Sequence, residues 1–413
     1  MDSPLLPSWL IKGHTSSIFI LPIIFSVALG VLYILKARLR TAPAIQNEKA
    51  PARPHASKAP ARIPGHWQPS SYRRPKPVPY PDWSLTETKP LPYRAFRYGP
   101  KYNVTMGLRT LTMDDWIQLD NLYPKYHADK ARRIRERGSR SARSAPEAYP
   151  AAVELLEELA DYLPARYPSL FRRTEVGIDN LYSGESFNIV QRPLPEDPIM
   201  TCGRLVQDDV ILMIEGTDGI YRLLSAAALL PGFWRLDDKF GMTLSELHTS
   251  GDVPQYKEKL ERGMMHFFTR LKCEDIYSRN NYFIQVDDDL AWSWSIGNED
   301  DSGAKLGWGR AEKDRAIEHH HFRSERQTLR RLPKTGAVVF TVRTYLHPIT
   351  EIAKEDYVPG RLASAVRSWG DDVSRYKGKE RYGDVLLEYL DKEHEKQVAR
   401  GLKPEQEETM YPW

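Results

Sequence analysis

The stretch from Arg323 to Pro333 carries the densest set of side chains that could do chemistry. Just before a β-rich run it places five polar residues close together: Glu325, Arg326, Gln327, Arg330 and Arg331. Guanidinium groups bind carboxylates in a bidentate geometry, and a charged pair beside a reacting group can deliver protons. The alternative is a buried ion-pair network that only holds the edge of a sheet. The residues alone support both interpretations equally.

Other side chains of chemical interest are few. His319, His320 and His321 are consecutive, so their rings cannot easily converge on one metal ion, and a solvated turn is the better interpretation. Only two cysteines are present, Cys202 and Cys273, which excludes a disulfide scaffold and a four-cysteine zinc or iron–sulfur site. The sequence contains no Gly-rich dinucleotide fingerprint, P-loop, nucleophile elbow or HExxH motif.

Composition narrows the class further. The chain has 413 residues, 41% of them hydrophobic, which is enough for a substantial core. Lys and Arg number 59 against 55 Asp and Glu, and this net charge of +4 is too small to indicate nucleic-acid binding.

Residues 18–35 predict a transmembrane helix, because they form an uncharged apolar run close to the roughly 20 residues that cross a bilayer. A secretory signal peptide would have a shorter apolar core and a small-residue cleavage site. Lys36, Arg38 and Arg40 follow the run, so the positive-inside rule places the rest of the chain in the cytosol, and the endoplasmic reticulum is the expected membrane. The sequon at Asn103 would then stay unglycosylated.

The elements that must position the polar residues come after a Pro-rich stretch. Residues 42–100 hold 13 of the 31 prolines, which predicts an extended, solvated linker over 36–102. Globular character is expected over 103–395, between a short tail at 1–17 ahead of the anchor and a second tail at 396–413. The basic run 130–143 is interpreted as a solvated helix face rather than a nucleic-acid contact.

Within the globular part, apolar spacing predicts helices around 114–119, 151–163, 255–271, 361–369 and 382–390. Residues 210–214 and 221–224 flank Asp218-Gly219 and predict a hairpin, and 337–345 predicts a strand. Strands between helices, without a strand–helix repeat, indicate an α+β fold with an antiparallel sheet.

Four segments, in the same order, resemble the haem-dependent oxidative N-demethylase (alpha-subunit-like) family, whose fungal members are called the HRQ family. They are Met106–Arg109 running into Asp114–Pro124, Ala226–Leu236, Lys239–Tyr256, and Arg323–Pro333 continuing through Gly336–Tyr345. Together they cover about 106–345, and Tyr376-Lys377-Gly378 extends the likeness.

The resemblance implies a PAS-like antiparallel sheet surrounded by helices, which binds haem b and performs oxidative chemistry. Bacterial members demethylate secondary amines with O2 and draw electrons through flavin and iron–sulfur partners. The present chain has no such signature, so a separate NAD(P)H-dependent flavin reductase is implied. Fungal relatives commonly act in secondary-metabolite pathways, so the substrate need not be a simple amine.

The resemblance also points to site residues. His248 matches the family's Leu/Ile-His…Val-Pro position and is the implied axial iron ligand, with His266 and His347 as alternatives. Residues 249–252 form a longer, more acidic spacer after it than the family pattern has. Haem propionates need cationic partners, for which Arg330, Arg331 and Arg343 are the candidates, and Arg326, Gln327 and Glu325 are the candidate catalytic residues.

Phe233, Trp234, Met264 and Met265 could line a cavity, although plain core is the better interpretation. A thiolate ligand from either cysteine has nothing to support it. The favoured hypothesis is a membrane-anchored haem monooxygenase or oxidative N-demethylase acting on a small molecule. The alternatives are a haem-binding sensor or carrier without turnover and a haem-free interaction protein, and the fold by itself cannot separate them.

Overall fold

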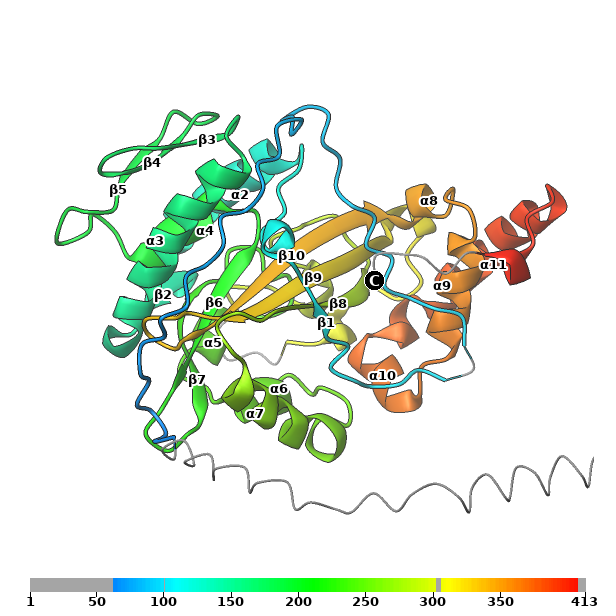
Figure 1. The fold of residues 1–413 in the computed structure, drawn as a ribbon. Helices are drawn as coiled ribbons and strands as arrows, with labels where there is room; N and C mark the ends of the chain where they lie inside the picture. Colours follow the sequence, from blue (N-terminus) through cyan, green and yellow to red (C-terminus); the bar gives the residue numbers. More distant parts are fainter. Residues whose placement is uncertain (1–61, 100, 302–305, 408–413) are drawn as a thin grey trace, which may run out of the picture. The chain divides into compact units, whose positions relative to one another are not determined.

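A seven-stranded antiparallel sheet organises the chain (Figure 1). The computed structural model describes residues 62–99, 101–301 and 306–407. In sheet order the strands are β1 (Arg109–Thr110), β8 (Ile276–Gln285), β9 (His321–Arg331), β10 (Val338–Pro348), β6 (Asp209–Glu215), β7 (Tyr221–Ala227) and β2 (Ala142–Ser144). The predicted α+β class with an antiparallel sheet is confirmed.

Two hairpins form the middle of this sheet. The β6–β7 hairpin turns through Gly216–Gly219, where the Gly219 amide bonds to the Gly216 carbonyl at 2.8 Å, so the predicted Asp-Gly turn is confirmed. The β9–β10 hairpin pairs Arg331 with Val338 and continues in register for eleven residue pairs. The predicted strand at 337–345 is therefore confirmed as part of β10.

The register assigns each strand residue to one of two faces, because successive side chains on a strand alternate. One side of the sheet carries the odd-numbered residues of β8 and β9 and the even-numbered residues of β10, and we call this side the α7 face. We call the opposite side the α3 face. For example, Gln327 and Val342 are paired on the α7 face, whereas Arg326 and Arg343 are paired on the α3 face.

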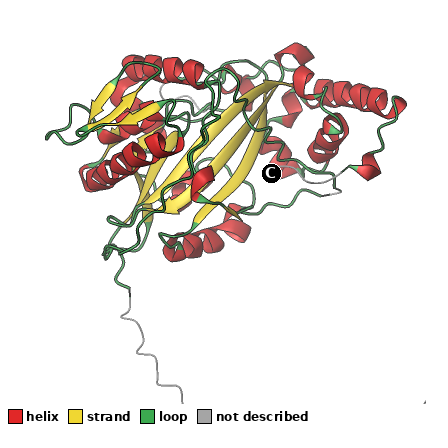
Figure 2. Cartoon of the chain, turned by 45° about the horizontal axis from the view of Figure 1, so that its top comes forward, coloured by secondary structure: helices red, strands yellow, loops and turns green. Residues whose placement is uncertain are grey.

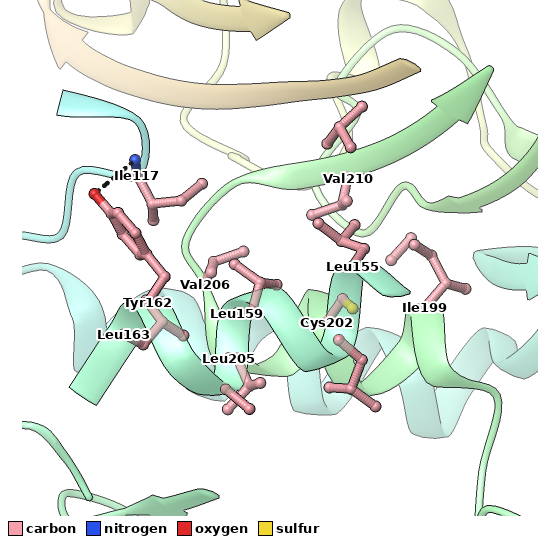
Figure 3. Close-up of a cluster of buried hydrophobic side chains, with 14 of the residues drawn as sticks. Ile117, Leu155, Leu159, Tyr162, Leu163, Ile199, Cys202, Leu205, Val206 and Val210 are labelled. Atoms are coloured by element: carbon pink, nitrogen blue, oxygen red, sulfur yellow. Dashed lines mark hydrogen bonds between the residues drawn. The ribbon is translucent and has the colours of Figure 1, made fainter. Parts of the chain in front are cut away.

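Two groups of helices cover the α3 face. The first is α2 (Tyr123–Arg137), α3 (Tyr149–Arg166) and α4 (Pro198–Leu205), whose apolar side chains form a core with β6. In Figure 3, Leu155 and Leu159 of α3 meet Val206 and Val210 beneath the sheet. The second group packs on Tyr282 and Ile284 and consists of α8 (Ile349–Ile352), α9 (Val358–Arg367) and α11 (Gly383–Ala399).

The α7 face is covered by the segment between β7 and β8. This segment forms α5 (Leu236–Lys239), α6 (Leu244–Thr249), a π-helical turn (Tyr256–Leu260) and α7 (Glu261–Arg270). Its apolar residues make a separate core with Leu329 and Val338 of the sheet. A further short helix, α10 (Asp371–Tyr376), follows α9.

A second sheet lies beside α3 and is small and antiparallel (Figure 2). It consists of β3 (Phe171–Arg173), β4 (Gly177–Asn180) and β5 (Ser186–Asn188). Short 3-10 turns complete the described elements: Met113–Asp115, Gly138–Arg140, Pro146–Ala148, Trp294–Ile296, Trp308–Arg310, Ile317–His319, Lys379–Arg381 and Pro404–Gln406.

Four of the five predicted helices are present, but the helix expected near residue 114 is wrong. Only the single turn Met113–Asp115 forms there. Arg326 on the α3 face donates to the carbonyls of Asp115 and Trp116, which removes acceptors that a continuing helix would use. A tertiary contact thus replaces local helix bonding.

The basic run 130–143 is only partly the solvated face that was expected. The Lys130 ammonium is fully buried and donates to the carbonyls of Gly203 and Val206 at 3.2 and 3.1 Å. Burial lowers its pKa to about 8. Arg133 is buried in a bidentate ion pair with Glu299, both contacts measuring 2.6 Å.

The Pro-rich segment also differs from a solvated linker. Residues 62–99 contain no helix or strand, yet they lie along the globular unit rather than apart from it. Trp83 and Phe96 are buried, and the Trp67 indole donates to the Pro333 carbonyl at 2.9 Å. The predicted membrane span at 18–35 lies outside the described residues. Within the described ranges, no helix is long and apolar enough to cross a membrane.

Candidate functional site

The sheet separates the predicted site residues into two groups. Glu325, Gln327 and Arg331 lie on the α7 face, whereas Arg326, Arg330 and Arg343 lie on the α3 face. Adjacent strand residues point to opposite sides of a sheet, so Arg326 and Gln327 cannot line the same pocket. The expectation that the whole set forms one site must therefore be revised.

The three α3-face arginines already have partners within the protein. Arg343 is fully buried, 2.7 Å from the Asp120 carboxylate, with its guanidinium 3.8 Å from the Tyr126 ring centroid. Arg330 pairs with Glu158 on the same face. Together with the Arg326 contacts to carbonyls, these interactions correspond to the structural ion-pair network. Arg330 Nε and Nη2 and Arg343 Nε are buried without hydrogen-bond partners among the described residues.

Arg331 lies on the α7 face but at the far end of β9. Its guanidinium donates to the carbonyls of Leu271 and Gly336 at 2.8 and 2.5 Å, and to the Tyr221 hydroxyl at 3.0 Å. These bonds join the β9–β10 hairpin to the end of α7. Arg331 therefore has a structural role in place of the expected cofactor contact.

A cluster of polar side chains remains in the middle of the α7 face. We define the α7-face polar cluster as Arg279, Asn281, Glu325, Gln327 and Lys377. Gln327 Nε2 donates to Glu325 Oε2 at 3.0 Å, and Lys377 Nζ lies 3.4 Å from Asn281 Oδ1. Gln327 Oε1 and Arg279 Nε are buried without hydrogen-bond partners among the described residues. Unsatisfied buried polar atoms are costly, so these two atoms are able to bond a polar ligand on this face.

His248 lies on α6, which packs over this face. Thr243 begins the helix with a capping box that includes Glu246. The His248 Nδ1 atom is 2.7 Å from the Leu244 carbonyl oxygen. A carbonyl only accepts, so Nδ1 carries the proton and Nε2 keeps its lone pair. Burial lowers the His248 pKa, and the positive charges of Arg279 and Lys239 act in the same direction. A neutral imidazole with a free Nε2 is a metal-ligand form of histidine.

The other histidines are placed differently. His266 is exposed on α7, and His347 lies on the α3 face, where burial lowers its pKa to about 4. His320 is fully buried and His321 is 9% exposed, so the expected solvated turn is wrong for these two residues. No group of three or more His, Cys, Asp or Glu side chains in the described ranges is arranged to hold a metal ion.

Sequence reasoning missed Arg279 and Lys377. Lys377 is 2% exposed, with its ammonium 4.4 Å from the Phe283 ring centroid, and burial lowers its pKa to about 7 despite the opposing charge of Glu325. Arg279 could have been found as a charged residue within the β-rich stretch 276–285. Lys377 could have been found from the Tyr376-Lys377-Gly378 segment, which extends the family resemblance.

The apolar candidates belong to packed regions. Met264 is a buried member of the α7-face core, and Trp234 and Met265 pack against it. Phe233 contacts Phe283 and Trp308 with centroid distances of 5.1 and 5.3 Å. Cys202 and Cys273 are both buried as free thiols. The plain-core interpretation fits these positions.

Comparison with known families adds one finding. The sequence model of the family described as haem-dependent oxidative N-demethylase, alpha subunit-like, matches residues 107–387. The match begins just before β1 and ends within α11, so it includes all seven strands of the large sheet and every member of the α7-face polar cluster. His248 lies within it as well.

Proposed function

Because the chain belongs to the haem-dependent oxidative N-demethylase alpha-subunit-like family, we propose that its α7 face holds haem through His248 and carries out oxidative chemistry there. The family assignment makes the protein an oxidoreductase of haem-dependent type. The observation that carries the placement is the His248 geometry, with Nδ1 bonded to the Leu244 carbonyl and Nε2 available.

The residues on this face fit such a group. Haem would need a nitrogen ligand for its iron and cationic partners for its propionates. His248 would supply the nitrogen. Arg279 is a half-buried cation on the same face, and its buried Nε has no partner among the described residues. On the α3 face, Arg326, Arg330 and Arg343 are each already bonded to a protein group, so we favour the α7 face.

When bound, haem supplies the centre at which O2 is reduced and a C–H bond beside nitrogen is oxidised. For an N-methyl amine the overall balance is amine, O2, two electrons and two protons giving the demethylated amine, formaldehyde and water. Glu325 can accept a proton or hold a cationic amine, and the Gln327 amide holds that carboxylate in place. Lys377 is a second proton-exchanging group in the cluster near neutral pH.

The order of the central strands supports a PAS-like description. In the sheet they run β7, β6, β10, β9, β8. The strands of this series that come first and last along the chain, β6 and β10, are therefore neighbours at the centre of the sheet. The helical segment between β7 and β8 then covers one face, which is where we place the haem.

The identity of the partners is also part of the proposal. Electrons would come from a separate reductase, since the chain shows no flavin or iron–sulfur motif. The apolar run at 18–35 supports a single-pass anchor in the endoplasmic reticulum, with the domain in the cytosol. Membership of the fungal HRQ group, and with it a secondary-metabolite substrate, rests on the sequence likeness.

The test is the absorption spectrum of the full chain produced with haem supply. We expect a Soret band that is lost or shifted in His248→Ala and unchanged in the matched control His266→Ala, since His266 is exposed. A colourless, folded parent would refute haem binding and favour the interaction-protein alternative. Haem binding without product formation in the presence of O2, reductant and N-methyl amines would favour a sensor or carrier.

A further inference from the structure

The chain between His248 and the helix predicted over 255–271 has an irregular backbone, and the first turn of that helix is not a regular α-helix. The amide of Val253 returns to the His248 carbonyl at 3.1 Å, which closes the extra residues 249–252 into a turn. Asp252 and Gln255 have φ angles of 52° and 55°, a conformation that few side chains adopt. The π-helical turn Tyr256–Leu260 follows directly. Such turns are rare and are frequent at functional sites.

This turn brings the Tyr256 ring against the His248 imidazole. The two ring centroids are 4.7 Å apart and the ring planes differ by only 7°. Tyr256 is 2% exposed, so its ring is held by the surrounding core. His248 is thus restrained twice, at the Nδ1 edge by the Leu244 carbonyl and over its face by Tyr256. Both restraints leave Nε2 free.

The residue before Tyr256 connects the turn to the other side of the site. Gln255 Nε2 donates to Asp372 Oδ2 at 2.7 Å, and Asp372 is in the first turn of α10. α10 ends at Tyr376, next to Lys377 of the α7-face polar cluster. The hydrogen bond therefore fixes the π-helical turn relative to the element that carries Lys377.

We propose that Tyr256 is a positioning residue for the axial ligand, and that the Gln255–Asp372 bond holds Tyr256 in place. By stacking on His248, Tyr256 sets the plane of the imidazole and the direction of its Nε2. Groups around a ligating histidine commonly orient it in this way. The inference rests on the proposed ligation by His248, and it assigns a purpose to the longer spacer at 249–252.

Two substitutions of Tyr256 distinguish the effect of its aromatic ring from the effect of its hydroxyl group. Tyr256→Phe keeps the stacking, whereas Tyr256→Met fills similar space without an aromatic plane. The readouts are the electron paramagnetic resonance spectrum of the ferric protein, which reports how uniformly the imidazole is oriented, and haem titration of the apo-protein. We expect Tyr256→Phe to match the parent. Tyr256→Met should broaden the ferric signal and weaken haem binding about threefold to tenfold, the usual range for an aromatic pair.

An unbroadened signal and parental haem affinity in Tyr256→Met would overturn the positioning role. If circular dichroism shows that this variant does not fold, Asp372→Ala replaces it, because Asp372 is half-buried and its loss releases Gln255. We expect a broadened ferric signal there too, and a parental spectrum would overturn the proposal. A Soret band that survives His248→Ala would refute the ligation itself. A His248-dependent band indifferent to Tyr256 would refute the positioning role alone.

Discussion

Replacing Arg343 with methionine tests whether the α3-face arginines are structural. In the parent, the guanidinium is fully buried, 2.7 Å from Asp120 Oδ2 and stacked between the rings of Tyr126 and Tyr345 at 3.8 and 4.5 Å. Arg343→Met would leave the Asp120 carboxylate buried without its cation. Removing one partner of a buried pair typically costs about 3–5 kcal/mol.

For a domain of this size we expect the midpoint of thermal unfolding to fall by roughly 6–20 °C, at about 2–4 °C for each kcal/mol. The same free-energy loss should appear in urea unfolding with an unchanged m-value. The haem spectrum of the folded variant should equal that of the parent, because Arg343 and the α7-face polar cluster lie on opposite sides of the sheet.

The matched control is Arg367→Met. Arg367 also pairs with an aspartate, Asp391, but the two side chains are 50% and 43% exposed. Exposed ion pairs contribute about 1 kcal/mol or less, so this variant should unfold nearly as the parent does. Parental stability together with an altered Soret band in Arg343→Met would refute the assignment of faces and return Arg343 to the cofactor site.

Further predictions concern buried ionisable groups and one glycine. Burial lowers the His320 pKa from 6.5 to about 4, so the unfolded chain binds the extra proton between these values. The unfolding free energy should therefore fall by about 3 kcal/mol as pH drops from 6.5 to 4, and less in His320→Leu. Lys377, with a pKa lowered to about 7, should make stability rise from pH 7 toward 10.5, and Lys377→Met should flatten that slope in urea unfolding. Gly378 has φ +72°, and an added Cβ would lie 2.3 Å from the Trp308 ring. Gly378→Ala should lower the unfolding midpoint clearly more than Gly401→Ala, where φ is also positive but the space is open; equal shifts would contradict the contact.

Local pattern was sufficient for most of the fold. The Asp218-Gly219 turn with its flanking apolar runs gave the β6–β7 hairpin, and apolar spacing gave the helix at 151–163. These elements depend on side-chain period and turn chemistry, which act over a few residues. The four ordered segments were likewise enough to identify the family, as the match over 107–387 confirms.

The alternation of side chains along a strand was enough to show, from sequence, that Arg326 and Gln327 do not share a site. Arg326 and Gln327 are neighbours in β9, so parity alone places them on opposite faces. The alternation along a strand does not show which face of the sheet holds the site. That depends on which helices return to cover each side, and the chain segments involved are far apart in sequence.

The sequence by itself determined the antiparallel α+β class, the main elements and the family. Only the tertiary structure decided which polar residues are available for chemistry. In sequence, Arg326, Arg330 and Arg343 look as suitable as Arg279, but in the structure each of these three bonds an acceptor from a distant segment of the chain. The tautomer of His248 was decided in the same way, by the carbonyl that its Nδ1 contacts. The burial of a polar side chain and the identity of its hydrogen-bond partners depend on packing between distant segments, so they cannot be inferred from the residue type alone.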